Sequence, residues 1–396
     1  MIINADEPRY SIADPYPWYK WVQQEKPVFR TSEGMWMITG YEDALMLLSD
    51  PRCSHWGQDS RTFQYLSPVE KAIAQTLHAL APGNTPAFRK QIMHQLAART
   101  LQVDEDDMKR QADKIFDALR FSSRMEFMSD YAHPFTFGTI CRVMGMPQEE
   151  VDAFSKIVSR LQGGYLSFID EKSWTNGGDE QKKTFIDTLR RLIGLKRQTP
   201  GKDLCSAILA VVPADDRNDS YIISLMVLLF YAGHQNMMNF MGNALVALQG
   251  RTEDQSMLRE SLPFAISSVD ELIRYDSPLQ SVLLITQEPI HLHGTTIPAG
   301  SQLLISIGAA NRDPAKFDNP DQLILTRRPN HLGFGAGAFR CIGARLAQIQ
   351  GGIGLHRFFA HVSTYAPVAD HISWSHFSVQ RGPSSILLDI NWNHEK

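Results

Sequence analysis

The chain lacks several features that mark whole classes of protein. Its cysteines number only four, are far apart and form no CxxC pair, which argues against a disulfide framework. Lys and Arg (39) do not outnumber Asp and Glu (43), so the net charge of −4 gives no reason to expect nucleic-acid binding. The most apolar stretch, residues 222–233, is too short to cross a membrane, and the first residues lack the basic and apolar segments of a signal peptide. We therefore expect a cytoplasmic protein with reduced thiols, without a membrane or nucleic-acid partner.

Local patterns predict a mixed, mainly helical chain. Apolar spacing and breakers predict a helix over residues 41–49, and residues 104–161 are also expected to be helical. The longest helix is expected over residues 219–250, and because it is apolar nearly all round it should run through the core. Strands are expected at 36–39 and 279–285, and a hairpin region at 290–307.

The most informative pattern surrounds Cys341. Apolar residues recur after it at spacings of four, three and four, which predicts that a helix begins there: Ile342, Leu346, Ile349 and Ile353. Unpaired N–H groups at a helix start favour the thiolate. Gly335, Gly337 and Gly343 permit tight turns and the close approach of a flat or bulky group. Such a thiolate suits a metal held from one side; the alternative is a buried free cysteine in a glycine-rich turn.

Four positions here carry a resemblance to a known family. The pattern Phe334-x-x-Gly337-x-x-x-Cys341-x-Gly343 resembles the heme-binding signature of the cytochrome P450 family. The resemblance implies that Cys341 is the axial ligand of heme b, with its thiolate pushing electron density onto the iron, and that Arg340 helps to bind the cofactor. It also implies a single domain over residues 1–396 with the family's triangular fold, mainly α with a smaller β region. In that fold the heme lies between the long central helix and the helix after the cysteine.

A second resemblance lies in the middle of the long helix, at Ala232-Gly233-His234-Gln235-Asn236. It is similar to the family's oxygen-activating segment, which makes Gly233, Gln235 and Asn236 candidate catalytic residues. Gln235 and Asn236 stand where the family usually has an acid and an alcohol. Amides do not transfer protons at ordinary pH, but they hold ordered water by hydrogen bonds. The alternative interpretation is that Gln235 and Asn236 have only a structural role and satisfy hydrogen bonds in a helix groove.

A charged pair precedes a proline at residue 278. Glu271 and Arg274 are three residues apart and so share a helix face, a spacing that on surfaces usually contributes little stability. Followed by Tyr-Asp-Ser-Pro, however, the pair resembles the family's buried ExxR motif, whose role is structural. The resemblance makes Arg327 a third member of that network.

The family's heme propionates usually have several basic partners, and most are replaced here. Arg89 fits one such position and is our candidate propionate ligand. Thr85, Leu284 and Phe339 stand where the family has His or Arg. Buried charges need partners, so we expect either propionates more exposed to water or compensation by Arg340.

The resemblance implies a monooxygenase that uses O2 and two electrons. We expect a small, largely apolar substrate, and a secondary metabolite is our interpretation of the bacterial type of sequence. The predicted pocket residues are Phe230, Leu279, Val282, Leu283, Ile285 and, at the tip of the last hairpin, Phe377. Because the chain shows no flavin or iron–sulfur segment, electrons are expected from a separate ferredoxin or flavodoxin with its reductase, docking near Arg340 and Arg345.

Two alternative functions follow from these departures from the family's pattern. The altered pair at 235–236 favours atypical heme-thiolate chemistry, either oxidative coupling or peroxide-driven turnover. The loss of propionate donors leaves room for a heme-binding protein without turnover. A metal site at His291 and His293 is not expected, because no third ligand is near in the sequence.

Overall fold

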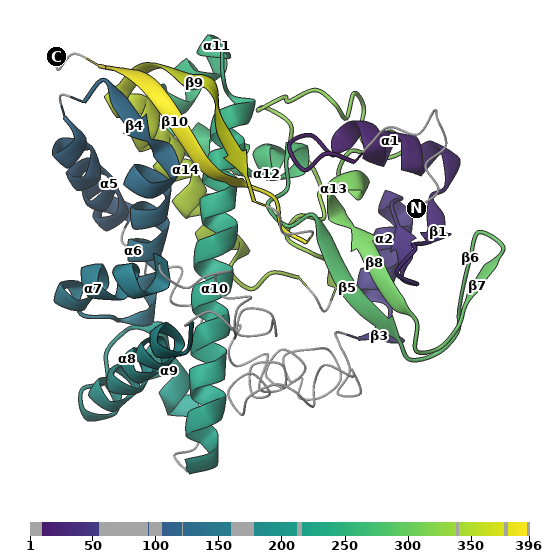
Figure 1. Cartoon of the computed structure of the whole chain (residues 1–396), viewed down its shortest axis with the longest axis horizontal. Coiled ribbons are helices and arrows are strands. Elements are labelled where there is room, and N and C mark those ends of the chain that lie inside the picture. Colours follow the sequence, from purple (N-terminus) through teal and green to yellow (C-terminus); the bar gives the residue numbers. More distant parts are fainter. Residues whose placement is uncertain are drawn as a thin grey trace. The chain divides into compact units, whose positions relative to one another are not determined.

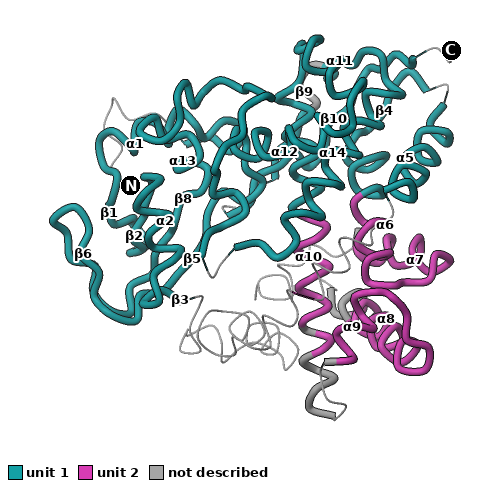
Figure 2. Tube along the Cα trace, turned by 180° about the vertical axis from the view of Figure 1, so that it is seen from behind, with its two compact units in different colours: residues 1–55, 105–135, 236–396 teal, residues 56–104, 136–235 magenta. Residues whose placement is uncertain are grey.

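A computed structural model describes residues 10–54, 94, 105–120, 122–159, 178–211, 216–337, 340–375 and 379–393. The chain divides into two compact units (Figure 2). Unit 1 comprises residues 1–55, 105–135 and 236–396, and unit 2 comprises 56–104 and 136–235. Our expectation of a single domain over residues 1–396 stays a prediction.

The β region of unit 1 is a five-stranded sheet in the order β1-β2-β8-β5-β3. Its strands are β1 (Val28–Arg30), β2 (Trp36–Ile38), β3 (Cys53–Ser54), β5 (Ser281–Thr286) and β8 (Gln302–Ser306). β2 and β8 run parallel, and the other neighbours are antiparallel. The hairpin β6 (Ile290–Leu292) and β7 (Thr295–Ile297) turns at His293 and Gly294, whose φ angles of 47° and 74° suit a tight two-residue turn.

Helices cover both faces of this sheet. α2 (Tyr41–Ser49) coincides with the predicted helix, and its Leu47 and Leu48 are buried with Leu303 and Ile305 of β8 in one apolar core. α1 (Tyr16–Glu25) and the short α13 (Ile307–Ala310) share a second apolar cluster, in which Trp18 and Val22 meet Ala309.

The helical part of unit 1 centres on α12 (Leu262–Tyr275) and α14 (Ala344–His361), which pack against each other (Figure 1). A Cβ on Gly352 would lie 2.5 Å from the Ile266 Cα, so the glycine lets the two helices approach closely. The Ser261 side chain caps α12 by accepting the Phe264 N–H at 3.2 Å. α11 (Thr252–Glu260) and α5 (Glu105–Leu119) also pack on α14.

A three-stranded sheet completes unit 1, in the order β4 (Arg124–Glu126), β10 (Pro383–Trp392), β9 (Val362–Trp374). The prediction that residues 104–161 are helical is wrong at residues 124–126, which form β4; the π-helix η2 (Met128–Ala132) follows. Met125 of β4 pairs with Leu388 of β10. Local periodicity cannot reveal a strand whose partner lies this far along the chain.

Unit 2 is helical. It contains most of α6 (His133–Met144), then α7 (Gln148–Ser159), α8 (Gly178–Gln198), α9 (Leu204–Val211) and the first part of α10 (Asp216–Ala247), which ends in unit 1. Its core includes the buried rings of Phe137, Phe154, Phe185 and Phe230. α10 is the longest described helix, as predicted. Among the described residues no helix is both long and apolar enough to cross a membrane.

Candidate active site: the cysteine loop

The cysteine loop, residues 331–343, is anchored first on α12. His331 Nδ1 accepts the Gly333 N–H at 3.0 Å, so the ring proton belongs on Nε2, which lies 3.2 Å from Asp270 Oδ1. Gln348 of α14 donates to both oxygens of Asp270, at 2.9 and 3.0 Å. Burial acts to raise the pKa of Asp270, but the hydrogen bonds from His331 and Gln348 outweigh it and the pKa is lowered. Asp270 thus stays an acceptor that joins the loop to two helices.

Backbone and side-chain bonds fix the rest of the loop from other elements. Asn311, which follows α13, accepts the Leu332 N–H at 2.8 Å, and the Tyr41 hydroxyl of α2 donates to the Asn330 carbonyl at 2.6 Å. Within the loop, the Cys341 N–H donates to the Phe334 carbonyl at 2.7 Å. This bond therefore joins the first residue of the signature to its cysteine.

Gly337 lets the loop lie against the end of α2. Its φ is +54°, and a Cβ there would lie 2.7 Å from the Ser49 Oγ and 3.0 Å from the Leu48 carbonyl oxygen. Both the backbone angle and the space exclude a larger residue. The glycine in the predicted signature thus has a steric reason that is independent of any cofactor.

Cys341 precedes α14, whose N-cap is Gly343, and this confirms the helix predicted from the apolar spacing. It is the exposed cysteine, whereas Cys53, Cys141 and Cys205 are buried. Protein atoms packed around the sulfur raise the pKa of its thiol, while the Gly343 N–H and the Arg340 charge act to lower it. A metal cation that replaces the thiol proton would bind this sulfur as a thiolate.

These residues fit heme. Among the described residues no group of three or more His, Cys, Asp and Glu side chains stands ready to hold a metal. A metal at Cys341 must therefore bring its other ligands with it, as the iron of heme does. Cys341 would be its protein ligand, with Arg340 exposed beside it. When bound, the heme supplies the iron at which O2 is reduced, with electron density from the thiolate favouring O–O cleavage.

The Glu271–Arg274 pair is fully buried and bidentate. Arg274 Nε lies 2.7 Å from Glu271 Oε2, and its Nη2 lies 2.9 Å from Oε1. Glu271 also accepts from Arg327 Nε at 3.2 Å and from the Ile324 N–H at 2.9 Å. Arg274 donates at 2.8–3.0 Å to three backbone carbonyls, those of Asn311, Pro320 and Gln322. The network thus ties residues 311–327 to α12.

The segment at the middle of α10 has its own surroundings. A Cβ on Gly233 would lie 2.7 Å from Ile140 Cδ1, so this glycine accommodates α6, a packing role that sequence reasoning did not foresee. His234 is buried with its ring edge-on to Phe137. Gln235 and Asn236 are half-buried. Asn236 Oδ1 accepts a hydrogen bond from Gln380 Nε2 at 2.9 Å, and no sequence pattern pointed to Gln380.

The predicted pocket residues of β5 lie on both faces of the strand. Along β5, Val282 and Leu284 face the apolar core, whereas Leu283 and Ile285 lie on the opposite face, because strand side chains alternate. Leu279 is half-buried just before the strand. Phe230 is fully buried in the aromatic core of unit 2, and this packing supplies a structural reason for its presence.

Several predicted residues lie outside the described residues: Arg89, Thr85, Phe339 and Phe377. Leu284, at one of the lost propionate positions, is fully buried among apolar side chains. It therefore offers no donor to an anion.

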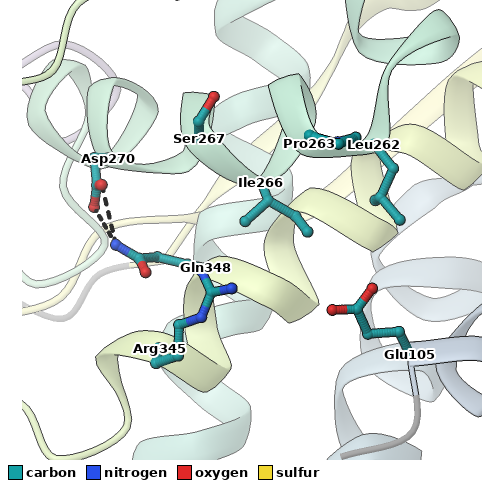
Figure 3. A pocket seen from close by; sticks show the side chains of 8 residues that line it. All are labelled: Glu105, Leu262, Pro263, Ile266, Ser267, Asp270, Arg345 and Gln348. Carbon is teal, nitrogen blue, oxygen red and sulfur yellow. Dashed lines mark hydrogen bonds between the residues drawn. The ribbon is translucent and has the colours of Figure 1, made fainter. Parts of the chain in front are cut away.

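A pocket of about 500 Å3 lies beside the first turn of α14 (Figure 3). Glu105 and Arg345 extend toward each other across it, and Asp270 and Gln348 form its hydrogen-bonded side. Its remaining lining comes from α12: Leu262, Pro263, Ile266 and Ser267. The pocket thus shares Asp270 with the anchor of the cysteine loop.

An exposed cysteine at a helix start and a buried Glu–Arg network are the features expected of a heme-thiolate protein. The family model described as Cytochrome P450 matches residues 224–366, which include the α10 segment, the Glu271–Arg274 pair and the cysteine loop. The Vitamin D(3) 25-hydroxylase of Pseudonocardia autotrophica is 30% identical over 359 residues, which are 88% of this chain and 86% of that protein. The chain belongs to the cytochrome P450 family, and it is a heme-dependent monooxygenase.

Two further comparisons agree. The Polyketide biosynthesis cytochrome P450 PksS of Bacillus subtilis (strain 168) is 27% identical over 394 residues, covering 93% of this chain and 94% of that protein. The crystal structure of P450BioI in complex with an acyl carrier protein that carries hexadec-9Z-enoic acid has a TM-score of 0.82. It is 24% identical, with 96% of this chain and 99% of that chain covered, and shows the same fold. The expected fold, mainly α with a smaller β region, is confirmed.

Proposed function

We propose that this cytochrome P450 oxidises a largely apolar organic substrate of secondary metabolism. The observation that carries the proposal is the exposed Cys341, held at the start of α14 in a loop that is anchored to Asp270 of α12 and to Asn311. The substrate class is supported by the relatives, which by name hydroxylate vitamin D(3) or serve polyketide synthesis. Both are substrates with extensive apolar surface. The half-buried Leu283 and Ile285 are apolar contacts that this chain offers at its β region.

The test is a titration of the purified ferric holoprotein with a library of steroid-like, polyketide-like and fatty-acyl compounds, followed by visible absorption. We expect apolar members to displace water from the iron and shift the heme band toward the high-spin form. Polar sugars and nucleosides of similar size serve as controls. A library in which only the polar compounds shift the band would overturn the proposed substrate class.

For electron delivery, we propose a separate ferredoxin or flavodoxin with its reductase. The support is the pair of exposed cations that flank the cysteine, Arg340 before it and Arg345 in the first turn of α14. The helix start adds a partial positive charge on the same side. Together they suit the acidic surface of a small electron carrier, because opposite charges raise association rates. The pocket beside Arg345 adds a recess of about 500 Å3 at this surface (Figure 3).

Peroxide-driven turnover is a second candidate. Asn236 has its amide oxygen bound to Gln380, so it is not free to replace the hydroxyl of the family's usual relay. Hydrogen peroxide would deliver oxygen, electrons and protons together. Product formed with peroxide in the absence of any reductase, at a rate matching the reductase-driven one, would favour this candidate.

A further inference from the structure

Three asparagines form a polar row on the otherwise apolar last part of α10, residues 236–247. Asn236, Asn239 and Asn243 are spaced by three and four residues, so they share one helix face. Asn239 and Asn243 are buried. The row faces residues 380–383, at the start of β10. The asparagine row and residues 380–383 both belong to unit 1.

The contacts along this row fix the register between helix and strand. Asn243 Nδ2 donates to the Arg381 carbonyl at 3.1 Å. A Cβ on Gly382 would lie 2.5 Å from Asn239 Cγ, and a Cβ on Gly242 would lie 2.8 Å from Pro383 Cδ. Two glycines, one on each partner, thus bring the backbones together. A shift of one residue would place a side chain where only hydrogen fits.

Gln380 is held on its other side as well. The Gln280 N–H donates to the Val379 carbonyl at 2.9 Å, and the Arg381 N–H donates to the Pro278 carbonyl at 2.9 Å. Arg381 is buried, forms an ion pair with Asp276 and lies with its guanidinium 3.9 Å from the centre of the Trp374 ring. The Gln380 side chain is therefore presented to α10 from a rigid support.

The chemistry of the Gln380–Asn236 bond sets the direction of the Asn236 amide. Gln380 turns its Nε2 toward Asn236, and Asn236 Oδ1 accepts a hydrogen bond from it at 2.9 Å. The Asn236 N–H2 has no partner among the residues that the structure describes. We propose that Gln380 is a positioning residue that locks the Asn236 amide, so that Asn236 presents hydrogen-bond donors to an accepting atom of the ligand.

This inference rests on the proposed function, in which Asn236 lies at the ligand side of α10. The family's usual alcohol both donates and accepts at one oxygen. A locked amide offers donors at nitrogen and keeps its acceptor occupied. The site therefore favours ligands or substrates that bring an acceptor, such as a carbonyl or ether oxygen, over ligands that bring a donor.

The experiment measures binding of two probes to the ferric holoprotein by visible absorption. Cyanide bound to iron exposes an accepting nitrogen, whereas bound imidazole exposes an N–H. Gln380→Glu replaces the donor with an acceptor, so the Asn236 amide turns to donate to it and presents Oδ1 to the ligand. Gln380→Leu removes the bond without reversing it. The matched control is Gln255→Leu on α11, which removes a side-chain donor to the Leu248 carbonyl.

We expect Gln380→Glu to weaken cyanide binding about three- to tenfold, the range of one hydrogen bond, without weakening imidazole. Asn236→Ala should weaken cyanide to a similar extent, and adding Gln380→Leu to it should have no further effect. Equal cyanide affinities for wild type and both Gln380 variants, with Asn236→Ala weakened, would overturn the positioning role. So would parallel losses for cyanide and imidazole, or an Asn236→Ala variant that binds cyanide as wild type does.

The reduced carbon monoxide complex separates these outcomes from a failure of the proposed function. A wild-type protein without the thiolate-type band would overturn both. A wild-type protein with the band, and with cyanide affinity indifferent to residue 380, would overturn the positioning role alone.

Discussion

His331 Nε2 lies 3.2 Å from Asp270 Oδ1, which ties the first residue of the cysteine loop to α12. Asp270 is itself held by Gln348, four residues into α14 from its first residue. The Asp270 carboxylate of α12 therefore binds both the cysteine loop and α14. The position of Cys341 depends on this shared contact as well as on the loop's own backbone bonds.

His331→Ala should loosen the cysteine loop. We expect the free energy of unfolding to fall by about 1–3 kcal/mol, because a part-buried carboxylate loses a donor, and heme to leave the protein faster. Urea unfolding and heme transfer to an excess of a heme-scavenging apoprotein measure the two effects. His356→Ala is the control, since it removes a contact between a histidine of α14 and the Leu258 carbonyl of α11. Equal rates of heme loss in both variants would contradict the anchoring role.

Arg274→Leu should be among the most damaging single changes in unit 1. It leaves the buried Glu271 carboxylate without its bidentate partner, and breaking such a pair costs about 3–5 kcal/mol. Arg124→Leu breaks the Arg124–Asp389 ion pair, whose side chains are 61% and 55% exposed, and should cost at most about 1 kcal/mol. Denaturant unfolding of both variants makes the comparison. Similar losses of unfolding free energy would show that burial does not determine how much the Glu271–Arg274 pair stabilises the fold.

Gly337→Ala tests the steric role of the loop glycine. Gly250 serves as its control, because its φ is +72° and a Cβ there would meet nothing within 4 Å. Gly250→Ala reports backbone strain alone, about 1–2 kcal/mol. Gly337→Ala adds the collision with Ser49 and should cost more and reduce heme content. The prediction fails if the two variants lose equal stability and keep equal heme.

Arg345→Glu should slow reduction by an acidic electron carrier. Reversing one exposed charge at the proposed dock lowers the association rate, and the difference should shrink at high ionic strength. Stopped-flow reduction by ferredoxin or flavodoxin, at low and high salt, measures it. Arg259→Glu makes the same charge change on α11, at an exposed residue elsewhere. Equal slowing by both variants would point to net charge rather than to a docking surface.

Features encoded locally were predictable from the sequence. The bounds of α2, the length of α10 and the helix after Cys341 follow from apolar spacing and breakers. The Glu271–Arg274 pair was visible because its two members lie three residues apart. The cysteine loop was visible because its glycines and cysteine are contiguous.

Features that depend on distant partners were not predictable in the same way. β4 exists because β10 pairs with it, and Gln380 matters because the chain returns to α10 after more than a hundred residues. His331 lies just before the predicted signature, but only the fold reveals Asp270 as its partner. Val282 and Leu283 were both predicted to line the pocket, but they lie on opposite faces of β5. The predicted strand already implied this alternation of side chains.

The central claim is that Cys341 binds the heme iron through its thiolate. The most direct test is the absorption spectrum of the reduced carbon monoxide complex of wild type and of Cys341→Ser. We expect the thiolate-type band in wild type and its loss in the variant, with Cys53→Ser, a buried cysteine in the β sheet, keeping it. A band that persists in Cys341→Ser, or that is absent from wild type, would contradict the account.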